Sequence, residues 1–261
     1  DQSTGEVKAI VGGRGDKTAS KTLNRATDTT RQPGSTFKIL ASYSAALDAG
    51  GLTLASVQDD APYTYAGANG KSVSNYDKRY RGFTTLREAI TDSINIVTVK
   101  TLAQVGVSLG WQYVQEYGFT TVDSRDMNEA LALGGITQGV SNLELTAAYA
   151  AIANQGTYIK PKFYTKILDH DGNVLIDNTT PESHTVIKDT TAWLLTSAME
   201  DVMTSGTGTS AYFGSSMAQA GKSGTTTSSR DALFAGYTPY YTCAVWGGYD
   251  DNAMQKGSDT N

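Results

Sequence analysis

The chain has 261 residues, of which 39% are hydrophobic and 18% are charged, as expected for a globular protein with a well-buried core. Its formal net charge of −5 and its pI near 5.0 argue against nucleic acid as a partner, because phosphate binding needs a basic surface. A single cysteine, Cys243, excludes an internal disulfide and a multi-cysteine metal site. No apolar run of about 20 residues is present, so we expect no membrane span within the chain.

The first predicted element is a strand over residues 5–13. Val7, Ala9 and Val11 alternate there on one face, as in a half-buried strand. A core strand so close to the first residue suggests a domain cut from a longer polypeptide.

A helix is predicted next, from about Ser35 to Asp48. Ser35 and Lys38 are three residues apart, so the hydroxyl and the amine lie on one helix face within reach of each other. A desolvated lysine can hold a neutral amine that takes the serine proton. The chain has two histidines, both outside any motif, so an acyl-transfer enzyme of this sequence would use lysine as its base. Alone, such a pair is common on solvated helix faces.

The next helical pattern covers residues 85–90, breaks near Asp92 and Ser93, and resumes over 97–103. Ser93 and Asn95 flank this break, two residues apart. A hydroxyl and an amide at such a break can both project into a cleft. Taken alone, an asparagine here is more often a cap or turn residue.

The second half of the chain has helical patterns followed by strands. The elements predicted are helices at 142–154 and 190–204, strands within 157–188 around a turn at 169–173, a strand at 218–225, and a hairpin of 231–237 and 241–249. This order predicts an α+β domain whose first and last strands share a sheet, with helices packed on it.

A third polar group lies on the predicted strand at 218–225. Lys222 supplies a cation there, and Ser223 and Thr225 supply hydroxyls. Gly224 between them lets another backbone approach closely.

These three elements, in this order, match the serine-lysine, serine-x-asparagine and lysine-Thr/Ser-glycine motifs of penicillin-recognising enzymes. Further matching segments are 24–26, 31–35, 131–135, 139–141, 206–208, 221–226, 236–239 and 245–250. Over nearly its full length the chain resembles the transpeptidase domain of class A penicillin-binding proteins.

Ser223 stands where threonine is commoner and keeps a hydroxyl. Leu233 stands where the family pattern has tryptophan, which is expected to reshape the cleft edge beside Asp231 and leaves the role of Asp231 open.

The resemblance implies an α+β fold with a mainly antiparallel five-stranded sheet, flanking helices and a large helical subdomain. It implies a single transpeptidase domain over 1–261, with an α/β part (about 1–34 and 157–261) and a mainly helical part (about 35–156). In that family a membrane anchor and a glycosyltransferase domain precede this domain. The implied location is therefore the bacterial cell membrane, with the domain on the extracytoplasmic side and attached only through that anchor.

The resemblance also implies a role for each motif residue. Ser35 would attack the penultimate D-alanine carbonyl of a peptidoglycan stem peptide, and Lys38, kept neutral by burial and by cationic Lys222, would take the serine proton. Ser93 would relay a proton to the leaving amine, and Asn95 would orient the substrate and Lys38. Lys222 would attract the terminal carboxylate.

The strand after Lys222 would complete the binding of substrate and of β-lactams. Ser223 and Thr225 would donate hydrogen bonds to the carboxylate, while Gly224 and Thr226 line the same strand. The backbone N–H groups of Ser35 and Thr225 would form the oxyanion hole. No metal and no cofactor is implied.

The implied reaction ends when an amine of a neighbouring stem peptide takes the acyl group, giving a cross-link. β-Lactams would acylate the same serine. The alternatives are a D,D-carboxypeptidase, a serine β-lactamase and a non-catalytic β-lactam sensor. A β-lactamase needs a deacylating base, and the expected Glu-x-x-Leu-Asn pattern is missing, since residues 142–145 have the order wrong.

Overall fold

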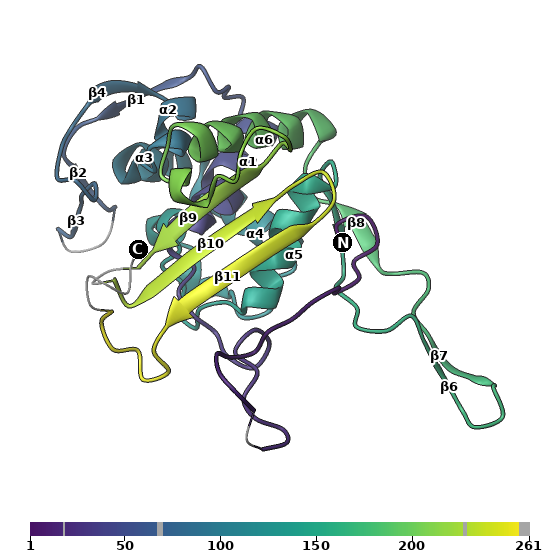
Figure 1. Ribbon diagram of the computed structural model, residues 1–261. Helices are drawn as coiled ribbons and strands as arrows, with labels where there is room; N and C mark the ends of the chain where they lie inside the picture. Colours follow the sequence, from purple (N-terminus) through teal and green to yellow (C-terminus); the bar gives the residue numbers. More distant parts are fainter. Residues whose placement is uncertain (18, 67–69, 227–228, 256–261) are drawn as a thin grey trace.

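The computed structural model describes residues 1–17, 19–66, 70–226 and 229–255, in which helices pack against one main antiparallel sheet (Figure 1). The helical elements are η1 (Gly34–Thr36), η2 (Lys38–Tyr43), α1 (Ser44–Asp48), α2 (Leu86–Thr91), α3 (Asn95–Val105), α4 (Val107–Glu116), η3 (Ser124–Asp126), η4 (Glu129–Leu133), α5 (Asn142–Ala153), α6 (Asp189–Thr204) and η5 (Thr209–Ala211). The strands are β1 (Val57–Asp60), β2 (Tyr63–Thr64), β3 (Ser72–Val73), β4 (Gly82–Thr85), β5 (Thr157–Ile159), β6 (Lys166–Leu168), β7 (Val174–Asp177), β8 (Ser183–Thr185), β9 (Ala220–Thr225), β10 (Asp231–Tyr237) and β11 (Thr242–Gly248). The predicted α+β class is confirmed.

The main sheet has the strand order β11-β10-β9, with antiparallel neighbours. Ala235 of β10 pairs with Lys222 of β9 and with Ala244 of β11, so these three side chains point to the same face. Helix α6 packs on β9, and α5 packs on β10 and β11. In Figure 1 the sheet passes in front of α4 and α5. The side chain of Lys222 therefore points into the interior between the sheet and the helices.

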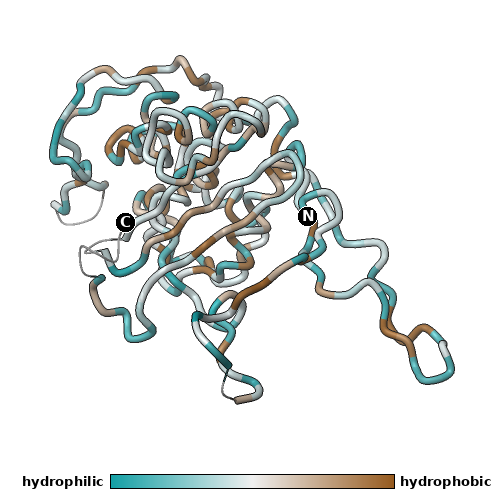
Figure 2. Tube along the Cα trace, in the orientation of Figure 1, coloured by the Kyte–Doolittle hydropathy of each residue, from teal (hydrophilic) through white to brown (hydrophobic). Residues whose placement is uncertain are grey.

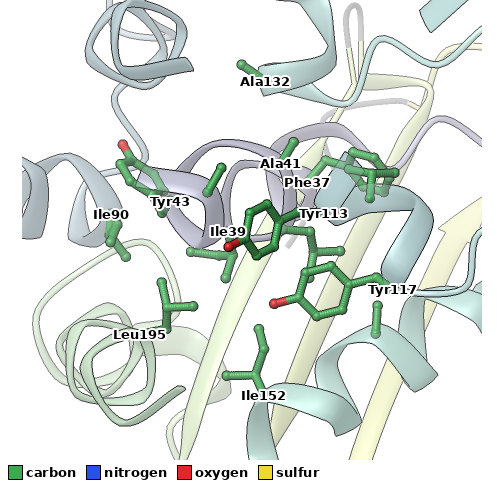
Figure 3. Close-up of a cluster of buried hydrophobic side chains, with 14 of the residues drawn as sticks. Phe37, Ile39, Ala41, Tyr43, Ile90, Tyr113, Tyr117, Ala132, Ile152 and Leu195 are labelled. Atoms are coloured by element: carbon green, nitrogen blue, oxygen red, sulfur yellow. The ribbon is translucent and has the colours of Figure 1, made fainter. Parts of the chain in front are cut away.

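The segment from η1 to α1 runs through the middle of the molecule. All six residues of η2 are buried, and side chains from α2, α4, α5, α6 and η4 surround the segment (Figure 3). Buried hydroxyls of this segment have partners inside the protein; Ser42 Oγ, for example, donates to the carbonyl of Thr98 at 2.9 Å. The predicted helix over 35–48 is confirmed in extent, but it is built from a 3₁₀ turn, a π-helical stretch and a short α-helix. Short π-helical stretches are frequent at functional sites.

The expected first strand at residues 5–13 is wrong, as is the expectation that the first and last strands share a sheet. Within the described residues, this segment forms one isolated bridge, from Glu6 to Lys162, and Val11 is 80% exposed. Among the described residues the main sheet has three strands, where five were expected. Alternation marks one face of a segment as apolar but does not determine its pairing partner. Among the described residues β11 pairs with β10, and residues 5–13 bridge to Lys162 instead.

Most other predicted elements are confirmed. Helices α2 and α3 are separated at the expected break, α5 and α6 occupy the expected ranges, and β10 and β11 form the expected hairpin. The turn at 169–173 joins β6 to β7 in a hairpin that projects from the body and has apolar residues along both strands (Figure 2). None of the helices in the described ranges is both long and apolar enough to span a bilayer.

Candidate active site

Ser35 lies in the middle of the η1 turn and is half-buried. Lys38 is the first residue of η2, with Phe37 between the two elements. A 3₁₀ turn has about three residues, so positions i and i+3 lie almost above one another and both side chains share one side. Two hydrogen bonds hold the turn. Thr36 Oγ1 donates to the carbonyl of Pro33 at 2.7 Å, and the Tyr149 hydroxyl donates to the carbonyl of Thr36 at 2.7 Å.

The Lys38 amine brings the first two motifs together. It is fully buried, donates to Asn95 Oδ1 at 2.6 Å and to the Ser93 carbonyl at 2.6 Å, and lies 3.1 Å from Ser93 Oγ. Ser93 has a φ of +56°, which turns the chain sharply between α2 and α3. This turn, at the helix break predicted from the sequence, directs both Ser93 and Asn95 at the same nitrogen.

Strand β9 brings the third motif against the Ser35 turn through two glycines. A Cβ added to Gly224 would lie 2.8 Å from the Pro33 carbonyl oxygen. A Cβ added to Gly34, whose φ is +54°, would lie 3.0 Å from the Thr225 oxygen and 3.4 Å from the Thr225 nitrogen. The backbones are therefore in direct contact, as expected for Gly224, and the amides of Ser35 and Thr225 belong to adjoining segments.

Burial changes the chemistry of both lysines. Burial lowers the pKa of Lys222 to about 7, and its Nζ donates only to the Ser223 carbonyl, at 3.3 Å, among the described residues. The pKa of Lys38 is lowered well below its ordinary value of 10.5, first by burial and then by the positive charge of Lys222. The site therefore favours a neutral amine on Lys38.

Ser223 has a partner that the sequence did not identify as a site residue. Its Oγ lies 2.8 Å from the hydroxyl of Thr207, which follows α6. Thr207 belongs to the Gly206–Gly208 segment that contributed to the family resemblance, but nothing in that segment predicts its contact with β9. Thr225, at the end of β9, has an exposed side chain.

Thr226 and Asp231 form a separate group at the end of the sheet. Thr226 Oγ1 donates to Asp231 Oδ2 at 3.1 Å and accepts from the Asp231 amide at 2.9 Å. The indole N–H of Trp246 donates to Asp231 Oδ1 at 2.9 Å. These bonds tie Asp231 of β10 to the end of β9 and to β11, so its carboxylate supports the sheet rather than the Lys38 amine.

Asn75 is a second residue that the sequence did not identify. It lies in the loop between β3 and β4, and its Oδ1 accepts from the amides of Asn95 at 3.0 Å and Ile96 at 3.2 Å. It is 20 residues from Asn95 in the chain, in a segment with no periodic pattern, so no local signal marks it.

The sequence is similar to known proteins over nearly its full length. The family model described as penicillin binding protein transpeptidase domain matches residues 1–259. Penicillin-binding protein 1F of Bacillus subtilis (strain 168) is 41% identical over 256 residues, which cover 96% of this chain and 34% of that protein. This chain therefore spans about a third of that relative's length.

Solved structures share the fold. Penicillin-binding protein 1A from Haemophilus influenzae superposes with a TM-score of 0.79 at 28% identity, covering 90% of this chain and 41% of the other. The penicillin-binding protein PonA1 from Mycobacterium tuberculosis superposes with a TM-score of 0.84 at 25% identity, covering 100% of this chain and 70% of the other. The chain belongs to the family of penicillin-binding protein transpeptidase domains.

Proposed function

We propose that this domain is a serine D,D-transpeptidase that cross-links peptidoglycan stem peptides through an acyl-enzyme on Ser35. The observation that carries this proposal is the buried amine of Lys38. It bonds to Ser93 and Asn95 and lies one turn from Ser35. A neutral amine in that position can act as a general base for a serine hydroxyl without histidine.

In the proposed acylation, Ser35 Oγ attacks the carbonyl carbon of the penultimate D-alanine and its proton passes to Lys38 Nζ. The tetrahedral intermediate collapses by breaking the C–N bond to the terminal D-alanine. Ser93, hydrogen-bonded to Lys38, hands the proton to the leaving amine. The products are free D-alanine and an ester on Ser35, and Lys38 is neutral again.

Strand β9 provides the binding surface in this proposal. Protonated Lys222 attracts the terminal carboxylate of the stem peptide, and the hydroxyls of Ser223 and Thr225 donate hydrogen bonds to it. The amides of Ser35 and Thr225 stabilise the oxyanion of the intermediate, in a role where loss of one donor costs about 3–4 kcal/mol in other enzymes. Thr226, bonded to Asp231, shapes the end of this strand.

An acceptor amine from a second stem peptide then attacks the ester and releases Ser35. The ring carbonyl of a β-lactam would acylate Ser35 in the same way, which is in keeping with the penicillin-binding names of the relatives. The proposed location is the outer side of a bacterial cell membrane, where stem peptides are available.

The experiment is incubation with a synthetic stem peptide ending in D-Ala-D-Ala, with and without an added D-amino acid as acceptor amine. We expect D-alanine release and a peptide–acceptor product by mass spectrometry, both lost in Ser35→Ala. Hydrolysis product alone, even with acceptor present, would instead indicate a carboxypeptidase. Turnover of benzylpenicillin within minutes would indicate a β-lactamase, and a stable penicillin adduct without D-alanine release would indicate a sensor.

A further inference from the structure

Helix α3, which begins at Asn95, receives its N-terminal cap from a distant loop. Its own N-cap residue, Ile94, has no side chain that accepts a hydrogen bond. The free amides of Asn95 and Ile96 donate instead to Asn75 Oδ1, at 3.0 and 3.2 Å. Since the first-turn amides of a helix have no intrahelical acceptor, Asn75 fixes where α3 starts.

Asn75 is held in turn by a buried carboxylate. Its Nδ2 donates to Asp60 Oδ1 and Oδ2 at 2.8 and 3.0 Å and to the Arg79 carbonyl at 2.8 Å. Asp60 has no exposed surface and also accepts from the amide of Arg81 at 2.9 Å. With acceptors around its nitrogen and donors around its oxygen, the Asn75 amide has one favourable orientation.

The same loop fixes the side chain of Asn95. Asn95 Nδ2 donates to the carbonyl of Ser74 at 2.8 Å, which leaves its Oδ1 directed at Lys38 Nζ, 2.6 Å away. Residues 74 and 75 therefore hold both the backbone and the amide of Asn95. A shift of this loop would move the acceptor on which the Lys38 amine is oriented.

We propose that Asn75, locked by Asp60, is a positioning residue for the acylation step, acting through Asn95 on Lys38. This inference rests on the proposed function, because acylation of Ser35 is its main readout. Asn75 itself bonds to none of the proposed catalytic side-chain atoms. Its effect is on the rate of the covalent step rather than on noncovalent binding of the ligand.

Asn75 donates to Asp60, so exchanging the two residue types between these positions tests the importance of their hydrogen bonds. Asn75→Asp leaves two carboxylates facing each other in a buried site, which is unfavourable. Adding Asp60→Asn restores a donor opposite an acceptor, while the oxygen at position 75 still accepts from the start of α3. Thr85→Ala is the matched control, since it removes the N-cap of the neighbouring helix α2.

The measurement is stopped-flow acylation by a fluorescent penicillin, which separates noncovalent binding from the rate of the covalent step. We expect Asn75→Asp to slow the covalent step by about tenfold to a hundredfold, with binding changed less than about twofold. The double variant should recover about half of that loss on a logarithmic scale, because the contact with the Arg79 carbonyl stays unfavourable and the 3.8 Å ion pair between Asp60 and Arg81 is lost. Thr85→Ala should lower the melting temperature by several degrees and leave the covalent rate within about twofold.

Two results would overturn this inference while the proposed function stands: Asn75→Asp acylating at the wild-type rate, or a slow single variant that the second substitution does not improve. If the wild type itself is not acylated, the proposed function fails. A crystal structure of Asn75→Asp then decides the inference separately. A Lys38 Nζ to Asn95 Oδ1 separation beyond hydrogen-bond reach would support it, and an unchanged separation would contradict it.

Discussion

The side-chain nitrogen of Lys38 lies 2.6 Å from Asn95 Oδ1, inside a site where Lys38 has no exposed surface. A neutral amine has two N–H groups and one lone pair. The two shortest contacts, to Asn95 Oδ1 and the Ser93 carbonyl, use both N–H groups. The lone pair is then left for a hydroxyl proton, which is the state that a general base requires.

Replacing Lys38 by arginine or by methionine should slow the acylation of Ser35 to a similar extent. Arginine keeps a positive charge but does not become neutral in a protein, so it cannot accept the proton. We expect both variants to lower the acylation rate by about a hundredfold to ten-thousandfold. Measured penicillin labelling in which Lys38→Arg stays near wild type would show that a charge, and not a base, is needed there.

Acylation should fall as the pH rises above about 7. Lys222 must be protonated to attract a carboxylate, and in the free protein its pKa is lowered to about 7 by burial. The second-order rate constant should therefore have an alkaline limb near that pH, while saturating ligand, whose carboxylate stabilises the charge, should weaken this limb. Lys222→Arg keeps the charge at all these pH values and should remove the limb. An identical limb in that variant would assign it to another group.

Lys222→Met should stabilise the fold, most strongly at low pH. The pKa of Lys222 is about 7 in the folded protein and near 10.5 when unfolded, so the unfolded chain binds more protons between these values. The stability of the wild type relative to the variant rises with pH through that window and is lowest below about pH 7. We expect the free energy of unfolding of the variant to exceed that of the wild type by roughly 3–5 kcal/mol at pH 6 and by far less at pH 10. Thermal denaturation of both proteins at several pH values checks this. A stability difference between them that does not depend on pH would contradict the lowered pKa of Lys222.

Gly224→Ala should slow acylation by separating β9 from the Ser35 turn. The new methyl group would lie 2.8 Å from the Pro33 carbonyl oxygen, so strand or turn must move and the two proposed oxyanion-hole amides would separate. We expect a loss of about a hundredfold in the covalent rate. Gly247→Ala on β11 is the control, because the nearest atom to its new methyl group is 3.9 Å away. Equal rates in the two variants would mean that the close approach does not matter.

Elements with strong local signals were predictable from the sequence. The start of α5 has Ser141 as its N-cap with Glu144 completing the capping box. The break before α3 follows from polar residues at 92 and 93, between two apolar patterns. The motif residues lie in the Ser35 turn, at the break before α3 and on β9. It was the resemblance to penicillin-recognising enzymes that predicted Ser93 and Asn95 near Lys38.

Features that depend on tertiary contacts were not predictable. Helix α4 was not predicted because its centre has Gly110, a poor helix former. A Cβ at that position would lie 2.5 Å from the Ala41 carbonyl oxygen, so the glycine serves the close crossing of α4 over η2. The strand expected at 5–13 had the right alternation but no neighbour in the main sheet. Asn75 reaches Asn95 only after the loop between β3 and β4 folds back.

In the proposed reaction, Ser35 is the residue that becomes acylated. The direct measurement is intact mass after incubation with benzylpenicillin, followed by peptide mapping of the labelled protein and of Ser35→Ala as a control. We expect one adduct with the full mass of benzylpenicillin, on the peptide that contains Ser35, and none in the variant. An adduct on another residue, or labelling that persists in Ser35→Ala, would contradict it.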